Sequence, residues 1–174
     1  VHNAAQVGSA SVYQVHRQDG SWELWASDTP DSAARLLADL PVNTEVATPL
    51  QPVSTFALFA SSTPQGECEV SRTDATAAGT FALEFSALHL ICPSRYRFTV
   101  TQAGNRGFFI LIDADLHGAI WETDGTVANT RQFTSPDLRV LWILQPALMD
   151  GRIVFAADED GQPSGLYAQA TDSA

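Results

Sequence analysis

Lysine is absent from this 174-residue sequence: its nine basic side chains are all arginine, against twenty Asp and Glu, for a formal net charge of −11. Without lysine the chain has no phosphate-loop lysine, no Schiff base and no catalytic Ser–Lys pair. An acidic surface without basic clusters argues against nucleic acid and anionic lipid as partners. We therefore expect neither partner.

Long hydrophobic runs are also missing. The longest, around residues 108–112 and 140–144, are about five residues, whereas a membrane-spanning helix needs roughly twenty. We expect no membrane insertion. Hydrophobic residues make up 45% and charged residues 17% of the chain, so it can bury a core, and its length suits one domain.

Cysteine is scarce, with only Cys68 and Cys92, and these two do not form a Cys-x-x-Cys motif. His89 is the one histidine near them in sequence, and tetrahedral zinc requires four ligands in paired spacings. We therefore expect no zinc site. The two cysteines are then either one structural disulfide or two inert thiols, and we favour a Cys68–Cys92 disulfide. The chain begins at Val1 rather than methionine, as a mature exported protein, a trimmed chain or a fragment would, and we expect an exported (periplasmic or extracellular) protein.

Strand patterns are plentiful, and helical patterns are weak. Four β-branched or aromatic runs occupy residues 11–15, 55–60, 107–112 and 152–157, and a polar, turn-rich stretch follows each of them. Such stretches are typical of hairpin tips, where Gly takes positive φ and Asp or Asn tolerates it. The chain therefore contains four similar hairpins.

The second strand of each hairpin ends in Ser-Asp or Thr-Asp. The aspartates are Asp28, Asp74, Asp124 and Asp172, which lie 46, 50 and 48 residues apart. Third strands are predicted at 34–40, 80–86 and 130–134, and fourth strands at 45–53, 96–102 and 139–145. Four antiparallel strands in each repeat of 40–50 residues indicate an all-β, β-propeller-like fold of about 3.5 to 4 blades. A β-sandwich is the alternative, but it would not place the same hairpin in every quarter of the chain.

The repeated segments resemble a known family. Residues 23–28 (ELWASD), 73–80 (TDATAAGT) and 120–130 (IWETDGTVANT), with the strand 36–40, resemble the ELWxxDGT repeat, also called hyalin-like, of large, mostly bacterial, exported proteins. The first copy has Thr29-Pro30 in place of Gly-Thr, and the second has Ala75 in place of Gly. The resemblance implies a propeller-like scaffold in an extracellular or periplasmic setting, with no agreed activity and no catalytic residues.

The chemistry of the motif suggests a structural role for the four aspartates. Asp124 can accept backbone N–H bonds across the turn, Gly125 can adopt positive φ, and Thr126 can start the next strand. Trp25 and Trp121 are expected to fill the space between neighbouring blades.

The predicted organisation is one propeller-like domain, 1–174, with repeats at about 9–53, 54–104, 105–150 and 151–174 and an N-terminal strand at 1–8. An open blade leaves unpaired strand edges. We expect either that the N-terminal strand completes the last blade, or that a second chain or a larger complex does.

Few residues suggest chemistry. His117 lies near Asp113 and Asp115, but a solvated turn is the favoured interpretation, as it is for the acidic stretch 158–161. Arg95 and Arg97 form a basic–aromatic cluster with Tyr96 that could hold a carboxylate or a sugar, and a paired, solvated edge is favoured there too. We assign no catalytic, cofactor-binding or metal-binding residues and expect no cofactor.

The favoured function is a non-enzymatic binding or scaffold module of an exported bacterial protein that presents propeller loops to a protein or glycan partner. One alternative is a carbohydrate-active hydrolase with carboxylates at the channel mouth. Another is an assembly subunit of a larger complex.

Overall fold

A computed structural model describes residues 3–40, 48–62, 68–83, 85, 90–91, 98–113, 117–141, 144–159 and 164–171. All regular structure in this part of the chain is β-strand, from β1 to β17. None of the described residues forms a helix long and apolar enough to cross a membrane.

The strands form four consecutive antiparallel blades. Blade 1 contains β1 (Asn3–Val7), β2 (Ala10–His16), β3 (Trp22–Ser27) and β4 (Arg35–Leu40). Blade 2 contains β5 (Gln51–Val53), β6 (Phe56–Ser62), β7 (Cys68–Thr73) and β8 (Phe81–Leu83). In both blades the strands lie side by side in chain order.

Blade 3 contains β10 (Val100–Ala103), β11 (Arg106–Asp113), β12 (Gly118–Thr123) and β13 (Arg131–Gln132), and the short β9 (Leu90–Ile91) also pairs with β11. Blade 4 contains β15 (Ala147–Met149), β16 (Arg152–Glu159) and β17 (Gly165–Ala170). The strand β14 (Leu138–Val140) pairs with both β12 and β16, which links blades 3 and 4 into one hydrogen-bonded sheet.

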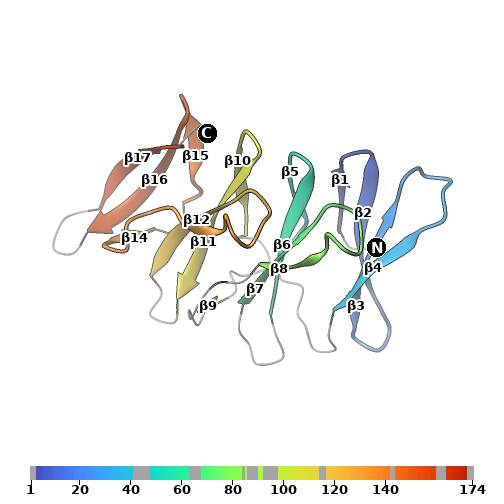
Figure 1. Ribbon diagram of the computed structural model, residues 1–174. Helices are drawn as coiled ribbons and strands as arrows, with labels where there is room; N and C mark the ends of the chain where they lie inside the picture. Colours follow the sequence, from blue (N-terminus) through green and yellow to red (C-terminus); the bar gives the residue numbers. More distant parts are fainter. Residues whose placement is uncertain are drawn as a thin grey trace.

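The blades stand side by side in chain order, with blade 1 and blade 4 at opposite ends of the row (Figure 1). The first strands of successive blades are in contact, β1 with β5, β5 with β10 and β10 with β15. These four strands therefore line the inside of an arc. This arrangement is β-propeller-like and confirms the predicted fold class over the sandwich alternative.

Apolar side chains fill the space between consecutive blades. One buried cluster, with Val12, Leu24 and Phe59 among its members, joins blades 1 and 2. A second joins blades 2 and 3, and a third joins blades 3 and 4. Strand side chains alternate between faces, so an inner blade has one apolar set for each neighbour. The continuous burial of residues 56–61 in β6 shows this pattern.

The blade boundaries lie one strand earlier in the chain than the predicted repeat boundaries. The predicted boundaries separate β5 from β6 and β10 from β11, which are hydrogen-bonded neighbours. In all four blades a two-residue loop joins the first two strands, as between Val7 and Ala10 or between Met149 and Arg152. The first loop residue has positive φ each time: Gly8, Ser54, Gly104 and Asp150. Gly104-Asn105 and Asp150-Gly151 are tight-turn dipeptides that signal this hairpin in the sequence.

The expected closure through the N-terminal strand is not what the structure contains. The strand β1 pairs with β2, from Asn3 opposite Gln14 to Val7 opposite Ala10, and it lies at the opposite end of the row from β17 (Figure 1). Among the described strands, the arc is therefore open between blade 4 and blade 1.

Candidate functional site

The repeated aspartate turns are held by several side-chain hydrogen bonds each. In blade 2, Oδ1 of Asp74 accepts bonds from the backbone N–H and the hydroxyl of Thr76, at 3.1 and 2.6 Å. In blade 3, Oδ1 of Asp124 accepts the same two bonds from Thr126, at 2.9 and 2.7 Å. The predicted capping of the turn by an aspartate therefore holds at both places.

Two threonines close each of these turns. The Thr73 and Thr80 hydroxyls are 2.8 Å apart in blade 2, and the Thr123 and Thr130 hydroxyls are 2.7 Å apart in blade 3. The later threonine of each pair also donates to the carbonyl of the residue four positions earlier, at 2.6 Å. The second and third repeats thus form the same turn.

The turn of blade 1 uses a different set of bonds, in keeping with its Thr29-Pro30 sequence. The Ser32 hydroxyl accepts the backbone N–H groups of Asp28 and Thr29, both at 3.0 Å. The Asp28 carboxylate receives two bonds from the Arg35 guanidinium, both at 2.9 Å. Asp172, the fourth predicted turn residue, lies outside the described residues.

The turns of blades 2 and 3 also dock on the blade before them. Nη2 of Arg35, in blade 1, donates to the carbonyl of Ala75 at 3.0 Å, and Nη1 of Arg72, in blade 2, donates to the carbonyl of Gly125 at 3.3 Å. Ala75 and Gly125 are equivalent turn positions with φ of 68° and 90°. An arginine of one blade therefore holds the turn of the next.

Side-chain size is matched at these two contacts. Ala75 is buried in the cluster between blades 1 and 2, which also contains Ala10. In the next interface Phe56 replaces Ala10 at the equivalent position, and a Cβ on Gly125 would lie 3.2 Å from two atoms of the Phe56 ring. The large ring therefore faces glycine, and the small side chain faces alanine.

The turn carboxylates are held in their charged form. Partial burial alone would raise the pKa of Asp74, but hydrogen bonds from Thr76 and the Arg72 guanidinium outweigh it and the pKa is lowered. The pKa of Asp124 is lowered in the same way, against partial burial, by Thr126 and Asn129. These aspartates accordingly act as structural anions.

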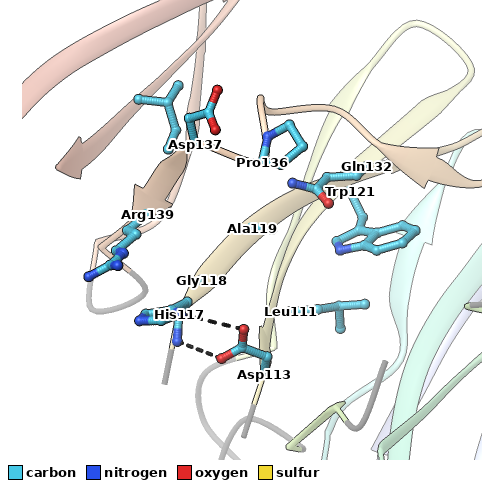
Figure 2. A pocket seen from close by; sticks show the side chains of 11 residues that line it. Leu111, Asp113, His117, Gly118, Ala119, Trp121, Gln132, Pro136, Asp137 and Arg139 are labelled. Atoms are coloured by element: carbon cyan, nitrogen blue, oxygen red, sulfur yellow. Dashed lines mark hydrogen bonds and ion pairs between the residues drawn. The ribbon is translucent and has the colours of Figure 1, made fainter. Parts of the chain in front are cut away.

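A pocket of about 260 Å³ lies against the outer strands of blade 3 and at the β11–β12 hairpin tip. Asp113 and His117 lie on one side of it, and Asp137 and Arg139 lie on the other (Figure 2). The backbone N–H of His117 donates to Oδ1 of Asp113 at 2.8 Å, and its Nδ1 is 3.6 Å from Oδ2. Asp113 therefore holds the hairpin tip together, as the turn interpretation predicts.

The second pocket, of about 710 Å³, lies between blades 3 and 4, and a buried carboxylate is among the groups that line it. Glu122 is 4% exposed and forms ion pairs with Arg106, at 3.2 Å, and Arg131, at 2.5 Å. The neighbouring Trp121 is buried between blades 2 and 3, with its ring centroid 5.0 Å from that of Phe85. Trp121 thus fills an interblade space as predicted.

Ionisable side chains are absent from the four strands that line the inside of the arc, β1, β5, β10 and β15. Among the described residues, no three His, Cys, Asp or Glu side chains are grouped to hold a metal ion. Cys68 begins β7 and packs against the cluster between blades 2 and 3. Cys92, Arg95, Arg97 and Asp115 lie outside the described residues, so the disulfide stays a prediction.

Sequence reasoning missed the two docking arginines. Arg35 follows the turn of blade 1, whereas Arg72 precedes the turn of blade 2, so the two arginines occupy different positions in the repeat. They nevertheless donate to equivalent carbonyls, those of Ala75 and Gly125. Arg72 also lies over two rings, its Cζ being 5.5 Å from the Phe56 centroid and 5.2 Å from that of Phe81. An arginine next to a repeated turn was the available signal.

No protein-family model and no curated protein matches the chain. The chain is similar in structure to a puromycin hydrolase (S511A mutant complexed with PGG), with a TM-score of 0.58 and 12% identity over 95% of this chain and 26% of that one. It is also similar to an acylaminoacyl peptidase of Pyrococcus horikoshii, with a TM-score of 0.55 and 12% identity over 98% of this chain and 26% of that one.

The β-propeller domain of the Trilobed protease from Pyrococcus furiosus matches with a TM-score of 0.40 and 13% identity, over 97% of this chain and 69% of that one. The chain spans about a quarter of the length of the puromycin hydrolase and the acylaminoacyl peptidase. At 12% identity these two likenesses concern the fold alone.

Proposed function

We propose that this propeller module is a non-enzymatic binding or scaffold module of an exported bacterial protein, which presents its loops to a protein or glycan partner. The observation that carries the proposal is that the acidic side chains of the blades and turns have structural partners within the fold. Asp28, Asp74, Asp124, Glu23 and Glu122 are all engaged by arginine or by turn donors.

The pocket of Figure 2 is the best candidate for a partner's side chain or sugar. It includes the hairpin tip of blade 3 (Figure 2), and none of its lining residues belongs to the strands that line the arc. Arg139, Asp137 and Gln132 give it donors and acceptors, which suits polar groups of a ligand.

Export is supported by the predicted Cys68–Cys92 disulfide, because disulfides persist in oxidising compartments. The acidic net charge of −11 favours neutral glycans or basic protein surfaces over nucleic acid.

A panel of immobilised neutral, amino and acidic oligosaccharides tests the glycan arm, with hits measured by calorimetry. Asp137→Asn should weaken binding of a hit about tenfold, since it removes one charge-assisted hydrogen bond. Asp31→Asn is the matched control, because Asp31 is exposed and lies in blade 1, far along the chain from the pocket; this variant should bind like the parent. Release of new reducing ends from any hit by the purified protein would refute the non-enzymatic role and favour the hydrolase alternative.

A further inference from the structure

A hydrogen-bonded pair of side chains recurs in the third strand of blades 1 and 2. In blade 1, Nε1 of Trp25 donates to Oε2 of Glu23 at 2.9 Å. In blade 2, the Ser71 hydroxyl donates to Oε1 of Glu69 at 3.3 Å. The two donors occupy the same place in their blades, since each pairs in register with the aromatic residue of the second strand. In both blades the glutamate two residues earlier accepts the bond.

Blade 3 has the donor but not the glutamate. Trp121 takes the place of the donor, and Ala119 takes the place of the glutamate. Within the described part of the chain, no group accepts a hydrogen bond from the indole N–H of Trp121, although the side chain is only 7% exposed. The short side chain of Ala119 leaves space where the other two blades have a carboxylate.

That space belongs to the pocket of Figure 2. Trp121 and Ala119 both line the pocket, and the indole nitrogen lies on the side of the ring that faces it (Figure 2). A buried N–H without an acceptor is costly, so a group that accepts its bond and replaces the water around it gains affinity. The pocket therefore suits a ligand with a hydrogen-bond acceptor at the place of the missing carboxylate.

The polar groups of the pocket are positioned by the fold. The Trp121 ring packs edge-on against Phe85, with centroids 5.0 Å apart and an interplanar angle of 87°. Gln132 is the register partner of Trp121 on β13. Across the pocket, the backbone N–H of His117 holds the Asp113 carboxylate at 2.8 Å. A site whose groups are already oriented loses less conformational entropy when a ligand binds.

The charges around the pocket select the chemistry of the ligand. Asp113 and Asp137 line it together with Arg139. A carboxylate ligand would accept the bond from Trp121 but would lie among two like charges. An ammonium or guanidinium group has donors only and would leave the indole N–H unpaired. A hydroxyl both accepts and donates, so it satisfies the indole N–H and a carboxylate at once.

We propose that Trp121 is the specificity-determining donor of this pocket and that its indole N–H binds a hydroxyl of a neutral sugar ring. The volume of about 260 Å³ is just below the range of about 300–1,000 Å³ for sites that hold drug-sized ligands, which suits a single ring. Leu111 and Pro136 give the pocket apolar surface for the C–H groups of that ring. The inference rests on the proposed function and selects a neutral glycan from the partners named there.

NMR of the 174-residue chain with isotope-labelled indole nitrogens tests the proposal. The probes are the methyl glycosides of glucose, galactose, mannose and N-acetylglucosamine, and Trp121→Phe identifies the Trp121 signal by its loss. That signal should shift with at least one sugar, at a dissociation constant of about 1–10 mM, as expected for a ligand of about a dozen non-hydrogen atoms. The Trp25 signal should stay in place, because Glu23 already accepts its N–H.

Two variants separate the hydrogen bond from the shape of the pocket. Trp121→Phe keeps an aromatic ring beside Phe85 and should weaken the sugar about tenfold, measured on backbone amide signals, because one hydrogen bond is lost. Trp25→Phe is the matched control and should bind like the parent. Ala119→Glu gives blade 3 the glutamate of blades 1 and 2, so it should abolish sugar binding and slow hydrogen exchange of the Trp121 N–H. If circular dichroism shows that Ala119→Glu does not fold, the comparison of the two phenylalanine variants decides.

Failure of this inference is distinguishable from failure of the proposed function. A glycan whose affinity is unchanged by both Trp121→Phe and Ala119→Glu would overturn the inference and leave a glycan-binding module. An unshifted Trp121 signal with all four sugars at about 50 mM, where a 10 mM ligand is mostly bound, would also overturn it. So would a shift caused only by an N-acetylated dipeptide amide, which would assign the pocket to a protein partner. Release of new reducing ends from a glycan that shifts the Trp121 signal would refute the non-enzymatic role and still support this contact.

Discussion

Gly125 is the turn residue whose replacement should most sharply test how the blades are locked together. Its φ is +90°, and a Cβ there would lie 3.2 Å from two atoms of the Phe56 ring. In Gly125→Ala, the left-handed backbone should cost about 1–2 kcal/mol of unfolding free energy. Overpacking against the ring should cost about 1–3 kcal/mol more. The ring has little room to move, because it is 3% exposed and lies beside the Arg72 guanidinium.

Gly104→Ala is the matched control. Gly104 has a φ of +61° in the β10–β11 hairpin, and a Cβ there would meet nothing within 4 Å. It should show the backbone cost alone, about 1–2 kcal/mol. Urea unfolding followed by circular dichroism at one protein concentration gives both free energies, and the melting temperature should fall by about 2–4 °C per kcal/mol.

The difference between the two variants is the decisive quantity. Equal losses for Gly125→Ala and Gly104→Ala would refute the packing argument. A double variant adds a second check: with Phe56→Ala present, Gly125→Ala should cost less, because the pair then copies the Ala10–Ala75 combination of the first interface. Phe56→Ala alone should cost about 3–5 kcal/mol. If it leaves too little folded protein, the Gly104 comparison still decides.

Three further outcomes are expected. Arg72→Met should lower the unfolding free energy by about 1–3 kcal/mol in urea unfolding, since it removes the bond to Gly125, the 2.7 Å ion pair with Asp74 and the ring contacts. A change no larger than that of Arg152→Met, at an exposed arginine of blade 4, would contradict its role. Acid should destabilise the fold below about pH 4. The lowered pKa values of Asp74 and Asp124 give stability that is present above the pKa of the unfolded chain and is lost as pH falls through the pKa of the folded one. Asp124→Asn should flatten the profile of unfolding free energy against pH, and Asp31→Asn should leave it unchanged. Reduction of the predicted Cys68–Cys92 disulfide should cost about 3 kcal/mol, and two titratable thiols in the untreated protein would show that the bond is absent.

The sequence predicted the local structure of this protein well. The aspartate turns at Asp74 and Asp124, the second and third strands that flank them, and the all-β fold follow from alternation and turn chemistry, which act over a few residues. Ala75 adopts the turn conformation of Gly125 despite its Cβ, since its hydrogen bonds and the docking contact from Arg35 hold it there.

The blade frame and the neighbours of each face were decided only by the tertiary structure. In the chain, the strands β5 and β10 each lie between two hairpins and could belong to the blade of either one. Their hydrogen bonds to β6 and β11 place them in the blade of the hairpin that follows. Trp25 and Trp121 occupy equivalent repeat positions, yet Trp121 is 7% exposed while Trp25 is half-buried and donates to Glu23 at 2.9 Å. A repeat makes similar faces, but whether a face is covered depends on which blade stands beside it, and residues close in sequence do not contain that information.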